Sequence, residues 1–248
     1  MPTLKALLNQ VLSNSLGLEI RKVELDLNRI RNRLISELDI DLIIDGGANV
    51  GQWGLNTKKF FMDIEIWSFE PTSNAYNQLV KAAYKYRKTW KTFQLGLGDQ
   101  NSTYKINIAS NGAESSSILS PNENLFQLYP SLSFRREEEI SVVKLDDLLE
   151  DVLPKSCYLK LDVQGFESMV LKGAENILKS IKIIEFESSF TPIYTGEKSH
   201  FEIVLDLISK NFVPWFTTRP HSDSRGRGFG LDTIMVNKTC LEHLGYEQ

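Results

Sequence analysis

The stretch DLIIDGGANVGQWG, residues 41–54, constrains the fold of this chain more than any other. Three consecutive apolar residues, Leu42 to Ile44, lead into a carboxylate, Asp45. Two glycines follow at once, and another stands at Gly51. A short apolar run that ends in glycines predicts a buried strand followed by a tight turn, because only glycine adopts positive φ freely and brings no side chain. The stretch therefore predicts a strand, a turn and a helix arranged around a nucleotide-like ligand.

Predicted strands and helices alternate along the rest of the chain, which indicates an α/β fold with a parallel sheet covered on both faces. Strands are expected at residues 42–45, 64–71, 91–99, 157–163, 181–188, 212–218 and 231–237. Helices are expected at about 50–61, from 73 onward, at 164–180 and at 201–212, the last opened by a capping box of Ser199 and Glu202. Residues 139–149 are expected to form an edge strand and a short helix, residues 101–139 an irregular region, and residues 219–230 a loop.

Charge and cysteine usage limit the partners of the chain. Its 248 residues carry a formal net charge of −4, so there is no overall basic field to attract nucleic acid. Two cysteines, Cys157 and Cys240, are too few for a disulfide framework and suit a reducing compartment. We therefore expect a cytoplasmic protein without a nucleic-acid partner.

The N-terminal residues carry a separate prediction. Apolar residues recur at helical spacing over residues 4–12, but polar residues interrupt them, so the stretch matches neither a signal peptide nor a membrane span. A second helix is expected over residues 27–38. We expect residues 1–40 to form an N-terminal helical extension, with residues 41–248 as the main domain. The striped first helix of the extension is expected to act as a lid or docking helix. Peripheral membrane association through the first helix and oligomer formation stay open.

Three kinds of cofactor site use a strand, a glycine turn and a helix. A P-loop needs a lysine soon after its glycines, and none closely follows Gly51. An NAD site needs glycines at i, i+2 and i+5, whereas the glycines here are at 46, 47, 51 and 54. Asp45 would also lie beside a pyrophosphate, which is electrostatically unfavourable. S-adenosylmethionine, which carries a sulfonium and an ammonium, tolerates that carboxylate.

Carboxylates also end the next two predicted strands. Glu70 ends the second strand and could accept hydrogen bonds from the ribose hydroxyls of such a cofactor. Asp99 ends the third strand and could accept one from the adenine amino group. Simpler alternatives are that Asp45 caps a helix, that Glu70 is a solvated strand end and that Asp99 begins a turn.

Five sequence blocks resemble the FkbM-type methyltransferases: IDGGANVGQWG, FEPTSNAYNQL, KLDDLL, LKLDVQGFESMVLKGA and LDTIMV. They cover roughly residues 40–237 in the order of the family, with Gln164 where the family usually has glutamate. The resemblance implies a class I methyltransferase fold, Rossmann-like and doubly wound around a mostly parallel seven-stranded sheet. It also implies S-adenosylmethionine-dependent methyl transfer to a hydroxyl, commonly of a sugar or a polyketide. The expected cofactor-binding residues are Asp45, Gly46, Gly47, Asn49, Gly51, Glu70, Pro71, Asp99 and Asp162.

The catalytic groups are expected at the ends of the fourth and fifth strands. Asp162 is the leading candidate for a general base or a metal ligand, because it ends the strand expected beside the first one. Glu187 lies nearer its strand end than Glu185 and is the next candidate, and His221 and His200 are candidate bases on loops. Oxygen ligands such as Asp162 and Glu187 could also hold Mg²⁺.

Two segments are expected to recognise the methyl acceptor. Residues 110–121 offer hydroxyl groups, including Ser116 and Ser117, that suit a polyol or the carboxylate of the cofactor. Residues 219–230 carry Arg219 and Arg225 on a glycine-rich loop, which suggests an anionic portion of the acceptor. The favoured hypothesis is an O-methyltransferase acting on a saccharide or a glycosylated small molecule. An NAD-dependent oxidoreductase and a non-catalytic methyltransferase-like scaffold are the alternatives.

Overall fold

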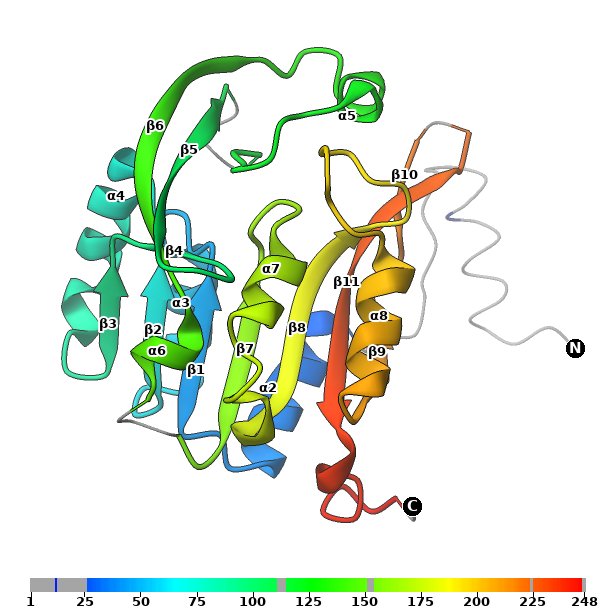
Figure 1. Cartoon of the computed structure of the whole chain (residues 1–248). Coiled ribbons are helices and arrows are strands. Elements are labelled where there is room, and N and C mark those ends of the chain that lie inside the picture. Colours follow the sequence, from blue (N-terminus) through cyan, green and yellow to red (C-terminus); the bar gives the residue numbers. More distant parts are fainter. Residues whose placement is uncertain (1–11, 13–25, 111–114, 151–153, 224, 247–248) are drawn as a thin grey trace, which may run out of the picture.

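The structure is a computed structural model that describes residue 12 and residues 26–110, 115–150, 154–223 and 225–246 (Figure 1). The apolar stripe predicted over residues 4–12 lies outside these residues, apart from Leu12. The second predicted helix is present as α2 (Leu27–Glu37). In the described part of the chain, no helix is both long and apolar enough to cross a membrane.

One twisted sheet organises the molecule, with strand order β10-β11-β8-β7-β1-β2-β3 and with β9 also paired to β11. The five strands β8, β7, β1, β2 and β3 run parallel to one another, and β11 is antiparallel to β8. The mostly parallel doubly wound sheet is therefore confirmed, and it has eight strands because β9 and β10 pair one after the other with β11. The strands are β1 (Leu42–Gly46), β2 (Glu65–Phe69), β3 (Trp90–Phe93), β7 (Cys157–Leu161), β8 (Ile181–Ser189), β9 (Phe212–Thr217), β10 (His221–Ser222) and β11 (Gly228–Asn237).

Alternating residues of the central strands fill a separate core on each face of this sheet. Ile43 and Ile66 pack with α2, α3 (Gln52–Lys58) and α4 (Ser73–Ala83) on one face. Ile44 and Leu159 pack with α6 (Leu145–Leu148), α7 (Glu167–Lys172) and α8 (His200–Ser209) on the other. The predicted capping box is confirmed, since a carboxylate oxygen of Glu202 accepts from the backbone N–H of Ser199 at 2.9 Å. The described residues also form three short 3-10 helices: η1 (Tyr84–Tyr86), η2 (Leu178–Ser180) and η3 (Lys238–Cys240).

A second, three-stranded sheet overhangs the carboxyl ends of the parallel strands (Figure 1). It consists of β4 (Gly96–Leu97), β6 (Phe134–Val143) and β5 (Ser102–Ala109), and α5 (Glu123–Leu128) lies in the connection between β5 and β6. Hydrogen bonds tie this connection to the β8–α8 loop: Asn122 N donates to Ile193 O at 3.1 Å, and Thr195 N donates to Ser120 O at 2.8 Å. The overhanging sheet and the β8–α8 loop therefore form a continuous roof.

Several sequence predictions need correction. The third predicted strand divides, because only β3 stays in the main sheet while β4 pairs with β6. The region 101–139 is not irregular, since β5 and most of β6 form a long antiparallel ladder there. The helix predicted over 164–180 is shorter, since α7 ends at Lys172. Its C-cap is Gly173, where a Cβ would lie 1.9 Å from Gly98 O. The loop predicted over 219–230 contains β10 and the start of β11.

Candidate active site

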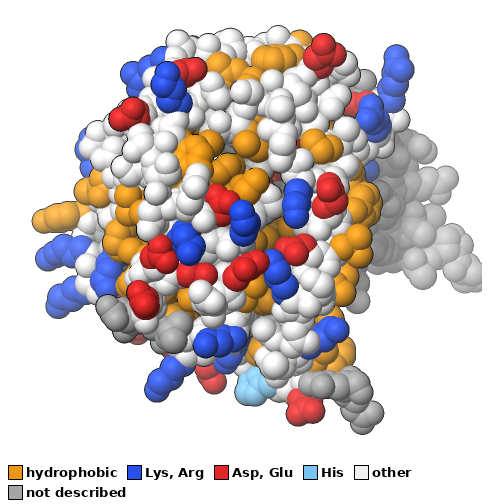
Figure 2. Space-filling view, viewed as in Figure 1, with side chains coloured by type: hydrophobic (Ala, Val, Ile, Leu, Met, Phe, Trp, Pro, Cys, Tyr) orange, Lys and Arg blue, Asp and Glu red, His pale blue; other side chains and the backbone are white. Residues whose placement is uncertain are grey.

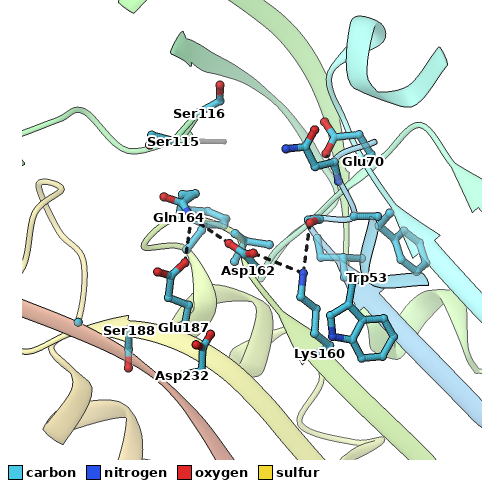
Figure 3. A pocket seen from close by; sticks show the side chains of 18 of the residues that line it. Trp53, Glu70, Ser115, Ser116, Lys160, Asp162, Gln164, Glu187, Ser188 and Asp232 are labelled. Carbon is cyan, nitrogen blue, oxygen red and sulfur yellow. Dashed lines mark hydrogen bonds and ion pairs between the residues drawn. The ribbon is translucent and has the colours of Figure 1, made fainter. Parts of the chain in front are cut away.

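A cavity of about 570 Å³ lies between the roof and the carboxyl ends of β1, β2, β7 and β8. The glycine turn after β1 and Glu70 after β2 line one part of it. Lys160, Asp162 and Glu187, from β7, the turn after it and β8, line another part (Figure 3). On the face seen in Figure 2, acidic and basic side chains are intermingled and no field of one sign forms.

The turn after β1 has little conformational freedom and few backbone N–H groups left to bind a ligand. Gly47 has φ of 76°, and a Cβ there would lie 1.9 Å from the carbonyl oxygen of Asp162. The N–H groups of Gly47 and Ala48 both donate to Phe69 O, at 3.0 and 2.9 Å, and the N–H of Asn49 donates to Glu70 Oε2 at 3.0 Å. Since a pyrophosphate needs free backbone donors at such a turn, these contacts disfavour an NAD site.

Glu70 holds this turn against the start of α4. Its Oε1 accepts from the backbone N–H of Thr72 at 2.8 Å and from the hydroxyl of Thr72 at 2.5 Å. Burial raises the pKa of Glu70, whose side chain nevertheless lines the cavity. A carboxylate has about four lone-pair positions, so Glu70 keeps some acceptor capacity toward a ligand. Asn49 Oδ1, beside it, is buried without a hydrogen-bond partner in the described part of the chain.

A row of polar side chains crosses the centre of the sheet on the α2 face. Strand register places Ser68, Asp45, Lys160 and Glu185 next to one another on β2, β1, β7 and β8. The Lys160 ammonium lies 3.3 Å from Asp45, 3.6 Å from Asp162 and 3.3 Å from the carbonyl oxygen of Gly47. Burial alone would lower the pKa of Lys160, but the neighbouring carboxylates raise it above its usual value. Lys160 therefore stays charged and links the glycine turn to Asp162.

The row continues into α2 through Arg31. Its guanidinium forms two hydrogen bonds with the buried carboxylate of Glu185, at 2.7 and 2.5 Å. Its carbon Cζ lies 5.0 Å from the ring centre of Trp53, and the hydroxyl of Tyr158 also donates to Glu185. Arg31, Trp53 and Glu185 all line the cavity, so α2 forms part of its wall.

Gln164 joins two acids at the other end of the cavity. Its amide nitrogen donates to Asp162 Oδ1 at 2.9 Å and to Glu187 Oε2 at 3.2 Å (Figure 3). Asp232 on β11 stands opposite Glu187 in the strand register. Burial and the charges of Asp162 and Asp232 raise the pKa of Glu187 to about 8. Glu187 can therefore exchange a proton near neutral pH, as a general base must.

Comparison with known proteins decides the family. The model of the methyltransferase FkbM domain matches residues 45–214, more than half of the chain, from the end of β1 into β9. The chain belongs to the FkbM methyltransferase family. This agrees with the resemblance predicted from the sequence blocks and with the class I methyltransferase fold.

Relatives of this FkbM chain are distant. It is 26% identical over 157 residues to methyltransferase sdnD of Sordaria araneosa, a match that covers 54% of this chain and 60% of that protein. It is 25% identical over 181 residues to hexuronic acid methyltransferase AglP of Haloferax volcanii, covering 70% of this chain and 67% of that protein. Among solved structures, an FkbM methyltransferase from Methylobacillus flagellatus KT superposes with a TM-score of 0.51 at 16% identity, covering 79% of this chain and 44% of that chain. The chain thus spans about 60% of the first-matched relative, and the structural likeness shows the fold alone.

Not all the residues expected at this FkbM site reach the cavity. Those that line it are Gly47, Asn49, Glu70, Pro71, Ser116, Asp162, Glu187 and His221. Asp45 and Gly46 belong to β1, beneath the cavity, and Gly51 is the N-cap of α3 with φ of 90°. Ser117 is buried, and its hydroxyl donates a hydrogen bond to the carbonyl oxygen of Gln164. Asp99 pairs instead with Lys172 at 2.7 Å, so its position does not support the expected adenine contact. Arg219 and Arg225 are exposed and do not line the cavity.

The structure adds residues that the sequence did not indicate. Tyr129, Phe229 and Asp232 line the acid end of the cavity, and Arg31 and Trp53 line it from the α2 side. The sequence did hold a signal for Asp232, because it is an acid within a mostly apolar strand. Tyr129 gave no such signal, since it lies in the region expected to be irregular. Within the described residues, no group of three or more His, Cys, Asp or Glu side chains is arranged to hold a metal ion, so the Mg²⁺ prediction is not supported.

Proposed function

We propose that this FkbM protein is an S-adenosylmethionine-dependent O-methyltransferase that methylates a hydroxyl of a saccharide or a glycosylated small molecule. One observation carries the proposal. One cavity is lined by the glycine turn and by Glu70, the acid that directly follows the neighbouring strand β2. The same cavity reaches a second group of acids that includes Glu187. The first part suits a nucleoside-containing cofactor and the second suits deprotonation of a hydroxyl.

The residues at the turn suit the cofactor. Glu70 would accept hydrogen bonds from ribose hydroxyls, and the unpartnered Asn49 Oδ1 offers an acceptor for an ammonium or another N–H donor. The apolar lining from Leu95, Leu97 and Phe166 suits a purine ring. When bound, S-adenosylmethionine would supply the methyl group from its sulfonium.

The acid end would activate the acceptor. Glu187, whose pKa is raised to about 8, would take the proton of the reacting hydroxyl on a carboxylate oxygen. Gln164 would hold Glu187 and Asp162 in place through the hydrogen bonds of its amide nitrogen. The roof would exclude water from the reacting groups, which favours transfer to the acceptor over hydrolysis.

A saccharide acceptor is supported by the lining and by one relative. Carboxylates that accept hydrogen bonds and aromatic rings such as Tyr129 and Phe229 are groups that suit the polar edges and apolar faces of a sugar. AglP, a relative at 25% identity, is a hexuronic acid methyltransferase.

Calorimetric titration with S-adenosylhomocysteine tests the cofactor half of the proposal. We expect binding by the wild-type protein and a loss of about tenfold or more in Glu70→Gln, since each 1.4 kcal/mol changes affinity tenfold. Glu65→Gln is the matched control, because Glu65 begins β2, at the end away from Glu70, and pairs with Lys91 there. No binding by the wild type, or an equal loss in both variants, would contradict this half.

Methyl-labelled S-adenosylmethionine tests the reaction half against a panel of glycosides. The expected product carries the label in a methyl ether, which mild alkali does not release. Label recovered as a methyl ester or on nitrogen would show that the reacting group is not a hydroxyl.

A further inference from the structure

The acid end of the cavity holds more carboxyl groups than cationic side chains. Asp162, Glu187 and Asp232 line it, and no donor in the described residues forms a hydrogen bond to the Asp232 carboxylate. The two cations of the lining are already paired: Lys160 with Asp45 and Asp162, and Arg31 with Glu185. Asp162 is thus partnered by Lys160, whereas in the described residues neither Glu187 nor Asp232 forms an ion pair with a lysine or arginine, so a bound acceptor would meet these two acids.

An anionic acceptor does not suit this end. Arg219 and Arg225, the arginines expected to bind one, are exposed and lie outside the lining. The remaining titratable group with a positive form is His221, whose ring is exposed and stacks on Phe229 with centroids 6.1 Å apart. The charges of His221 and Arg31 both oppose the rise that burial and nearby acids cause in the pKa of Asp232. One solvent-exposed imidazole does not balance Glu187 and Asp232 together.

Aromatic rings line the same cavity as these acids. Tyr129 and Phe229 meet edge to face with centroids 6.0 Å apart, and both line the cavity. Tyr129 and Glu187 line the same cavity, and burial together with the charge of Glu187 raises the pKa of the Tyr129 hydroxyl. Carboxylates together with aromatic faces are the groups that bind organic ammonium ions in proteins.

We propose, on the basis of the O-methyltransferase function above, that the acceptor carries a protonated amine close to the reacting hydroxyl, as in an amino sugar. The ammonium would lie between Asp232 and the Tyr129–Phe229 wall, and the hydroxyl would face Glu187. A positive charge there would also favour the ionised form of Glu187 and so support its role as a base.

The test compares four glycosides on protein saturated with S-adenosylhomocysteine: methyl glucosaminide, its N-acetyl derivative, methyl glucoside and methyl glucuronide. Ligand-detected NMR measures the dissociation constants, which are expected to be weak. We expect the glucosaminide to bind about tenfold tighter than the other three, since close charge pairs in buried sites couple by at least that factor. Equal binding, tighter binding of the glucuronide or no binding of the glucosaminide would overturn the proposal.

Two variants locate the effect. Asp232→Asn should remove the preference for the amine while leaving the binding of S-adenosylhomocysteine unchanged. Glu139→Gln, on the exposed part of β6, should keep the preference. A preference that survives Asp232→Asn would overturn the assignment of the subsite. Failure of S-adenosylhomocysteine to bind the wild type would instead contradict the function on which the proposal depends.

Discussion

At the residue scale, the site depends on one lysine within an apolar strand. Lys160 is the cation between Asp45 and Asp162, and its side chain is only 8% exposed. Burial raises the pKa of Asp45, although Lys160 and the hydroxyl of Ser68 oppose the rise. Removal of one member of a buried pair is costly because it leaves the partner's charge without compensation. Lys160 therefore contributes to the fold as well as to the geometry of the glycine turn.

Lys160→Met tests this contribution. It should lower the free energy of unfolding by about 3–5 kcal/mol, because Asp45 stays buried without its cation. Urea denaturation at neutral pH measures the loss. Lys105→Met, at a strand lysine that is 72% exposed and paired with Glu137, is the control and should cost no more than about 1 kcal/mol. A similar small loss in both variants would show that Lys160 is dispensable for stability.

At the element scale, α2 is bound to the sheet by a polar anchor as well as by apolar packing. Ile30, Leu34 and Ile35 are buried in the core on that face, while Arg31 reaches Glu185 and stacks on Trp53. Because Arg31 and Trp53 line the cavity, the docking of α2 shapes one wall of the site. The division at residue 40 between an extension and a main domain stays a prediction. α2, which lies before this boundary, shares a hydrophobic core with the sheet.

Two arginines of α2 provide a matched pair of variants. Arg31→Leu should cost about 3 kcal/mol or more, because Glu185 keeps a buried charge, and should speed hydrogen exchange in α2. Arg33→Leu removes an exposed pair with Glu37 and should cost less than about 1 kcal/mol. Denaturation and hydrogen exchange measure both. Equal effects of the two substitutions would mean that apolar packing alone holds α2.

Local patterns predicted the elements that depend on local sequence. The strand–turn–helix from Leu42 to Lys58 and the capping box of α8 follow from apolar runs, glycines and a serine–glutamate pair, and the structure has them. The second sheet was missed because β5 and β6 are polar strands that pair over a long loop, and half-exposed strands lack a strong apolar signal.

The site residues also divide into those that local sequence predicted and those that depend on how distant segments pack. Strand-end reasoning brought Glu70, Asp162 and Glu187 to the cavity, because parallel strands end at one edge. Asp232 depends on the register of an antiparallel pair, and Arg31 depends on how α2 docks, neither of which the sequence states. Arg219 and Arg225 were misleading because β10 and β11 extend into their segment and leave both side chains exposed.

At the scale of the whole molecule, the cavity and the strands beneath it concentrate acids whose ionisation opposes folding. Burial is the first cause of the raised pKa values of Asp45, Glu70, Glu187 and Asp232. A carboxyl whose pKa is higher in the folded than in the unfolded chain stabilises the fold fully below its unfolded pKa, and that stability is lost as pH rises through the folded pKa. For Glu187, this interval runs from 4.5 to about 8.

Glu187→Gln should therefore flatten the dependence of stability on pH. The free energy of unfolding of the wild type should fall between about pH 5 and pH 8, by an amount on the order of a few kcal/mol from this group. The variant should match the wild type near about pH 5 and exceed it near about pH 8.5, because a neutral amide has no ionised form to bury. Denaturation curves across this range measure the difference, and the exposed Glu139→Gln should follow the wild type throughout. If the variant and the wild type lost stability in parallel, the protonation of Glu187 would not be coupled to folding, and its assignment as the base would lose its electrostatic support.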